Sequence, residues 1–119
     1  MSAVADAPPD VALYRGRRGR LAVVHLRGPA PRGPEAFAAA DRALVLRPRW
    51  LVLDLSEASE RWDGHHVVRT LGERLTAAGV RLALAGVHPR SVRPPEAGGG
   101  HGCPTFPTVP LALGTLGAL

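Results

Sequence analysis

The sequence contains no lysine, isoleucine, asparagine or glutamine, and its 119 residues include a single cysteine, Cys103. One cysteine excludes an internal disulfide framework and is typical of a reducing compartment. No apolar run approaches the roughly 20 residues of a membrane-spanning helix, and the N-terminus has neither the basic flank nor the apolar core of a signal peptide. We therefore expect a cytoplasmic protein that does not insert into a membrane.

All 15 basic residues are arginine, and the net charge is +5. Because lysine, isoleucine and asparagine have AT-rich codons, this composition indicates a GC-rich, bacterial genome, which weakens any argument from charge to partner. Excess arginine favours acidic partners such as nucleic acids. However, aromatic residues that stack on bases make up only 4% of the chain, and the arginines are spread along it. The sequence therefore predicts no nucleic-acid partner.

The segment Arg15–Arg20 alternates arginine with glycine and has two interpretations. It resembles the arginine/glycine tracts that bind RNA, but apolar strand patterns lie on both sides of it. Glycine supplies the positive backbone angles that a tight turn needs. The flanking strands therefore favour a hairpin turn.

The stretch from Trp50 to Gly79 organises the predicted fold. Residues 50–56 form a short, nearly continuous apolar run, which is typical of a strand buried on both faces. Val67, Val68, Leu71, Leu75 and Ala78 then recur at helical spacing. Asp63 is placed to cap the start of this helix, and Gly79 to end it in a left-handed turn.

Other patterns predict strands at residues 11–14, 21–27 and 80–85 and a helix at about 35–46. Two strand–helix–strand crossovers imply parallel pairing, and the first hairpin adds an antiparallel edge. We therefore predict an α/β fold, a mixed sheet of about four to five strands with helices mainly on one side. Residues 1–10 are expected to be a flexible tail and 11–119 one domain, with a Gly/Pro-rich loop at about 89–104 before an extended piece and a short helix.

The order and spacing of these blocks resemble the STAS domain, the fold of bacterial anti-sigma factor antagonists. The resemblance covers most of residues 11–88 and rests on the strand 21–28, the strand 50–56, the helix that opens at Asp63 and the segment 78–84. It implies a protein-binding module with no catalysis and no cofactor. In the antagonists, an Asp-Ser-Ser-Gly type sequence opens this helix, and an ATP-dependent anti-sigma kinase phosphorylates its second serine.

Matched to that motif, Asp63 stands at the aspartate, Gly64 at the first serine, His65 at the phosphoacceptor and His66 at the glycine. Neither Gly64 nor His65 has a hydroxyl group, so a serine kinase has nothing to modify there. The resemblance thus implies a regulatory module without the usual phosphorylation switch, whose partner is an anti-sigma factor of the kinase-like ATPase class. The expected partner-binding residues are Trp62, Asp63, Gly64, His65, His66 and Arg69.

The alternatives are a STAS subunit of a transporter or signalling complex, and a small-molecule-binding protein or enzyme. Ser56 or Ser59 is a candidate displaced phosphosite, although Ser56 is more simply a strand end and Ser59 a loop serine. Trp62 is either a hydrophobic staple against Val67 or an exposed anchor for a partner. Arg69 and Glu73 have the spacing of a solvated ion pair.

Two further kinds of chemistry at the same junction lack the residue pattern that they need. A metal site would combine His65 and His66 with His101 and Cys103, but adjacent helical residues point about 100° apart and lack the one-face spacing of zinc-binding pairs. An acid–base pair drawn from Asp54, Asp63 and His65 has no accompanying nucleophile motif or phosphate loop. His25, inside a predicted strand, is interpreted as structural.

Overall fold

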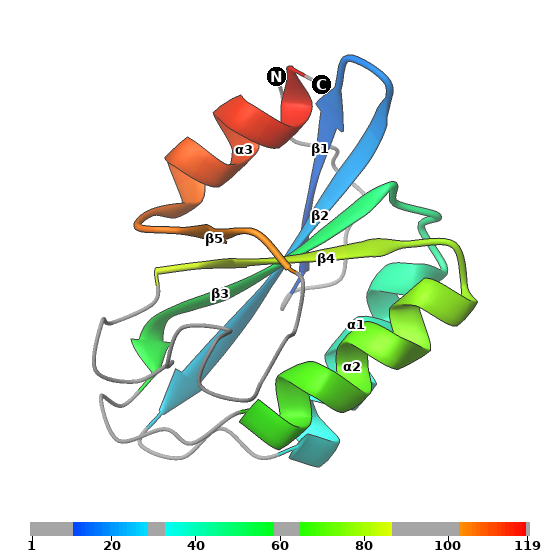
Figure 1. The fold of residues 1–119 in the computed structure, drawn as a ribbon, viewed down its shortest axis with the longest axis vertical. Helices are drawn as coiled ribbons and strands as arrows, with labels where there is room; N and C mark the ends of the chain where they lie inside the picture. The colour runs from blue at the N-terminus through cyan, green and yellow to red at the C-terminus, as the bar shows by residue number, and fades with distance from the viewer. Residues whose placement is uncertain (1–10, 29–32, 59–64, 87–102, 119) are drawn as a thin grey trace.

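A five-stranded mixed sheet in the order β1-β2-β3-β4-β5 organises the chain in a computed structural model (Figure 1). The structure describes residues 11–28, 33–58, 65–86 and 103–118. The strands are β1 (Val11–Gly16), β2 (Gly19–Gly28), β3 (Trp50–Ala58), β4 (Arg81–Ala85) and β5 (Thr105–Phe106). The helices are α1 (Gly33–Leu44), α2 (His65–Ala77) and α3 (Val109–Gly117).

Strand directions follow the prediction from the sequence. β1 pairs with β2 in antiparallel fashion, and β2, β3, β4 and β5 are parallel neighbours. The α/β fold predicted from the crossovers is therefore confirmed, including the antiparallel edge. Among the described helices, none combines the length and the apolar character needed to cross a membrane.

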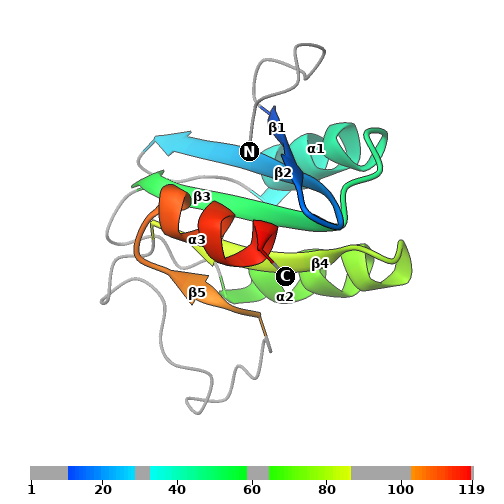
Figure 2. The same ribbon diagram turned by 90° about the horizontal axis from the view of Figure 1, so that it is seen from above.

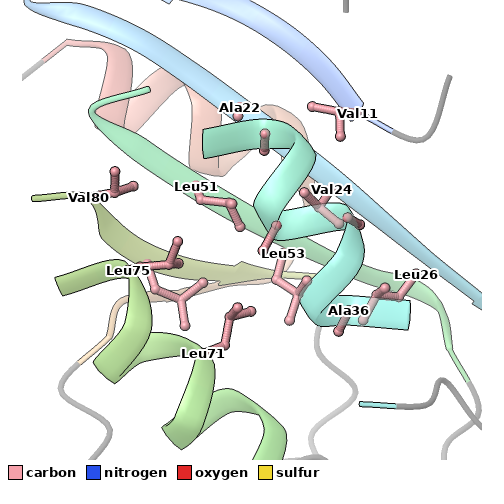
Figure 3. Close-up of a cluster of buried hydrophobic side chains, with 14 of the residues drawn as sticks. Val11, Ala22, Val24, Leu26, Ala36, Leu51, Leu53, Leu71, Leu75 and Val80 are labelled. Atoms are coloured by element: carbon pink, nitrogen blue, oxygen red, sulfur yellow. The ribbon is translucent and has the colours of Figure 1, made fainter. Parts of the chain in front are cut away.

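The strands bury both faces of the sheet, and each face has its own apolar layer. α1 and α2 cover one face, where Leu51 and Leu53 of β3 meet Leu71 and Leu75 of α2 (Figure 3). α3 covers the other face and packs on the alternate residues of the same strands (Figures 1 and 2). That layer contains Leu21, Val23, Trp50, Val52, Ala83, Ala85, Ala112, Leu113 and Leu116. The expected burial of the central strand on both faces is thus confirmed.

The segment Arg15–Arg20 is a hairpin turn that α3 supports from the side. Gly16 pairs with Gly19, and the N–H of Arg17 donates to the carbonyl of Gly117 at 2.8 Å. A Cβ on Gly16 would lie 3.1 Å from the Cα of Gly117, so glycine permits this close approach. Gly19 has the positive φ expected of a turn glycine, +156°. Gly16 does not have a positive φ, and glycine is needed there because α3 packs closely against it.

Helix α1 ends earlier than predicted, and small residues form its inner face. It ends at Leu44, two residues before the expected end, and Arg47 then takes a left-handed φ of 51°. The buried stripe consists of alanines, with Phe37 and Leu44 only partly buried at its sides. These alanines are Ala36, Ala39, Ala40 and Ala43. The predicted termination of α2 is correct, because Gly79 has a φ of +77°.

Helix α3 contains an exposed glycine that weakens it. Thr108 caps the helix by accepting a hydrogen bond from the N–H of Leu111 at 3.2 Å, but a Cβ on Gly114 would meet nothing within 4 Å. We expect Gly114→Ala to stabilise the protein by about 0.5 to 1 kcal/mol, because alanine restricts the unfolded chain more than glycine does. Urea unfolding checks this. Gly16→Ala is the contrasting variant and is expected to destabilise, and a Gly114→Ala protein that unfolds at lower urea would contradict the prediction.

Candidate functional site

We name the predicted partner-binding stretch of residues 62–66 the docking segment, and the described elements before and after it are β3 and α2. β3 ends at Ala58 and α2 begins at His65, so the chain leaves the sheet at the carboxyl edge of the parallel strands. Loops at the carboxyl ends of parallel strands are where α/β sheets commonly bind ligands. Ser59, Trp62, Asp63 and Gly64 lie outside the described residues. His65 and His66 are the first two residues of α2.

The exposed face of α2 has the ion pair expected from its sequence. Arg69 Nε lies 3.7 Å from Glu73 Oε1, and the side chains are 71% and 72% exposed. Such a solvated pair contributes little to stability. It leaves both charged groups accessible on the helix that follows the docking segment.

A polar cluster absent from the sequence predictions lies at the ends of β2 and β3. The carboxylate of Asp54 is buried, with His25 Nδ1 2.7 Å from Oδ2. Its Oδ1 accepts hydrogen bonds from the Ser56 hydroxyl at 2.6 Å and from the Ser56 N–H at 3.0 Å. We name His25, Asp54 and Ser56 the strand-end cluster.

A bulge in β3 explains why this cluster forms. His25 pairs with Asp54 and Arg27 pairs with Glu57, so β3 has one residue more than β2 between these two pairs. A bulge takes the extra residue out of the ladder, and Asp54 then accepts the N–H of Ser56. Gly86 follows β4 with a φ of +69° and lies against the backbone of Ser56. The cluster thereby fixes the end of β3, from which the chain continues towards α2.

The charge state of Asp54 follows from these partners. Burial by itself raises the pKa of the carboxyl, but the hydrogen bonds from Ser56, together with the hydrogen bond and charge of His25, bring the Asp54 pKa below its ordinary value. The group is therefore ionised at neutral pH. Its role is that of an acceptor that joins two strand ends.

The strand-end cluster contains serine, histidine and aspartate, but its connections differ from those of a nucleophilic relay. In such a relay the histidine lies between the serine and the aspartate. Here His25 and Ser56 both bind the same carboxylate, so the histidine does not receive the serine proton. The hydroxyl of Ser56, the candidate displaced phosphosite, is directed to Asp54.

Metal binding and thiol chemistry have little support in the described part of the chain. Within it, no group of three or more histidine, cysteine or acidic residues is placed to hold a metal ion. Of the four residues weighed as metal ligands, only Cys103 has a described side chain. Burial raises the pKa of the Cys103 thiol, which keeps it protonated at neutral pH.

The sequence contained a partial indication of the strand-end cluster. His25 and Asp54 each stand near the end of an apolar strand, where a polar side chain needs a partner. Their pairing depends on the register between β2 and β3, which the sequence did not specify. Comparison with known proteins adds no further assignment, because no family model and no curated protein matches this chain.

Proposed function

We propose that this protein is a regulatory protein-binding module that resembles an anti-sigma factor antagonist and lacks the usual serine phosphorylation switch. The observation that carries the proposal is that α2 begins at His65, the residue that stands at the phosphoacceptor position in the resemblance. The start of α2, which we propose contacts a partner, follows the strand end of β3 at the carboxyl edge of the sheet. The proposed partner is an anti-sigma factor of the kinase-like ATPase class, in the cytoplasm.

The absence of a hydroxyl at this position determines the proposed regulation. A phosphate adds about −1.5 to −2 charge, which the start of a helix tolerates well. A partner surface shaped for a neutral side chain would repel it. Because histidine at position 65 and glycine at position 64 present no hydroxyl to a serine kinase, the module would bind its partner whether or not ATP is present.

The strand-end cluster supports this proposal by fixing the end of β3, which precedes the docking segment. Asp54 joins β2 to the bulge of β3, and only the connection of residues 59–64 separates β3 from α2. At the other end of that connection, Val68 and Leu71 of α2 are buried against the sheet. Both described elements that the proposed partner would meet beside this connection are therefore held by the sheet.

A hydroxyl restored at the helix start should restore the switch. We expect His65→Ser to accept one phosphate when incubated with the host's kinase-like anti-sigma factor and ATP, and its affinity for that factor to fall at least tenfold afterwards. The wild type should bind with the same affinity before and after this incubation. Intact-protein mass spectrometry measures the phosphate, and titration calorimetry measures the affinity.

The matched control is His66→Ser, which places the same hydroxyl one residue further along α2. We expect no phosphate on this variant, because a kinase that recognises the helix start requires the hydroxyl at a defined position. Phosphate on the wild-type chain would contradict the proposal. So would failure of the folded wild type to bind any kinase-like anti-sigma factor of its host.

A further inference from the structure

The fold gathers arginines from three parts of the sequence at the amino-terminal edge of the parallel strands. The turn between β1 and β2, the connection from α1 to β3 and the start of β4 lie along one end of the sheet (Figure 1). Seven arginines occupy these segments, and all seven are exposed. We name them the arginine edge: Arg15, Arg17, Arg18, Arg20, Arg47, Arg49 and Arg81.

Backbone hydrogen bonds hold this edge together. The N–H of Arg49 donates to the carbonyl of Arg20 at 2.8 Å, and the N–H of Arg81 donates to the carbonyl of Arg49 at 3.1 Å. Neighbouring strands lie about 4.8 Å apart, so the backbones of these three arginines form one row at the starts of β2, β3 and β4. The hairpin turn extends the row and is itself held by the bond from Arg17 to α3.

The positive charges of the arginine edge have no acidic partners among the described residues. Arg20 donates to the carbonyl oxygen of Leu46 at 3.0 Å, and the guanidinium of Arg81 lies 4.9 Å from the ring centre of Trp50. Neither interaction neutralises charge. On the helices, Asp41 and Glu73 already pair with Arg74 and Arg69. Seven like charges on one edge repel one another, and a polyanion would relieve that repulsion.

The surroundings of these arginines favour the backbone of a nucleic-acid duplex over a protein. Protein interfaces depend on apolar or aromatic anchors at their centre. Trp50 is buried under Arg81, and the connection from α1 to β3 has one large exposed apolar side chain, Val45. Single strands are bound by exposed aromatic rings on which bases stack. A duplex offers regularly spaced phosphates, which arginine binds through bidentate hydrogen bonds.

We propose that the arginine edge binds the phosphate backbone of a nucleic-acid duplex without reading its sequence. The sequence predicted no nucleic-acid partner partly because its arginines are spread along the chain. In the fold, seven of these arginines lie together at one edge, so that argument no longer holds. This binding surface lies at the opposite edge of the sheet from the end of β3 and the start of α2 (Figure 1). Duplex binding is therefore independent of the proposed function, and in combination with that function it would bring the protein partner to DNA or duplex RNA.

Fluorescence anisotropy with labelled DNA and RNA duplexes of about 20 base pairs tests this proposal. We expect micromolar affinity at low salt, equal for two unrelated sequences, and a logarithmic salt slope of about 0.9 for each phosphate neutralised. The double variant Arg17→Ala/Arg18→Ala should bind at least tenfold more weakly, with a slope smaller by about two. Alanine keeps the backbone bond from residue 17 to Gly117, so the melting temperature should be unchanged.

The matched control is Arg69→Glu, which lowers the net charge by the same amount as the double variant but lies on α2, away from the arginine edge. We expect it to bind duplexes within about twofold of the wild type. Equal weakening by both variants would overturn the proposal, because net charge alone would then explain binding. Failure to bind either duplex, or preference for polyglutamate or for phosphatidylglycerol vesicles, would also overturn it. Binding of the double variant to the anti-sigma factor reports on the proposed function separately.

Discussion

Replacing Gly86 by alanine is expected to lower the free energy of unfolding by about 3 kcal/mol. Gly86 has a φ of +69°, which costs an L-residue about 1 to 2 kcal/mol. An added Cβ would also lie 2.7 Å from both the backbone nitrogen and the Cβ of Ser56. Backbone shifts that relieve such overpacking cost about 1 to 3 kcal/mol more. The N–H of Gly86 donates to the carbonyl of Phe106, so a shift would also disturb β5.

Gly79→Ala separates the two contributions to this loss. Gly79 has a φ of +77°, but a Cβ there would meet nothing within 4 Å. We expect it to cost only about 1 kcal/mol, the backbone contribution alone. Urea unfolding measures both variants, and the loss for Gly86→Ala should correspond to a fall in melting temperature of about 12 °C. Equal losses of unfolding free energy for the two variants would contradict a steric clash between a Cβ at position 86 and Ser56.

Replacing Asp54 by alanine is expected to lower the free energy of unfolding by about 2 to 3 kcal/mol at neutral pH. The substitution removes the carboxylate that accepts the N–H of Ser56 at the bulge, and a hydrogen bond to a charged group contributes about 1.5 to 3 kcal/mol. The Ser56 hydroxyl and the His25 ring lose the same partner. Because the His25 contact joins β2 to β3 and the Ser56 bonds hold the bulge of β3, we also expect weaker binding of the proposed protein partner.

The contribution of Asp54 should depend on pH in a defined direction. The folded state holds the Asp54 pKa below its ordinary value, through bonds from Ser56 and His25 that outweigh the effect of burial. The folded protein therefore keeps the carboxylate ionised where the unfolded chain would protonate it. This stability is fully present above the ordinary pKa of about 3.9 and is lost as the pH falls through the folded value.

Urea unfolding of the wild type and the Asp54→Ala variant between pH 7 and pH 3 checks this dependence. The difference in unfolding free energy should be constant near neutrality and shrink at the acid end. Ser56→Ala is the control variant, because it removes only the hydroxyl bond and should cost about 1 kcal/mol. A difference between wild type and Asp54→Ala that grows as the pH falls would contradict the assignment.

Most secondary structure could be predicted from the sequence because its determinants are local. The apolar run at residues 50–56 requires burial on both sides whatever surrounds it, and Gly79 ends α2 through its own backbone freedom. The end of α1 was misplaced because Val45 and Leu46 continue the apolar pattern, and Arg47 instead adopts a left-handed conformation before Pro48. Local pattern does not report such a turn.

The features of the candidate sites also divide into those that the sequence determines locally and those that depend on tertiary structure. The sequence alone determined that α2 follows the central strand and that position 65 has no hydroxyl group. Only the tertiary structure decided that His25 meets Asp54 across 29 residues of sequence, and that the arginines of three segments share one edge. The physical reason is register. Which residues of neighbouring strands lie opposite each other depends on long-range pairing and on a bulge, whereas helical and strand periodicity are properties of each segment by itself.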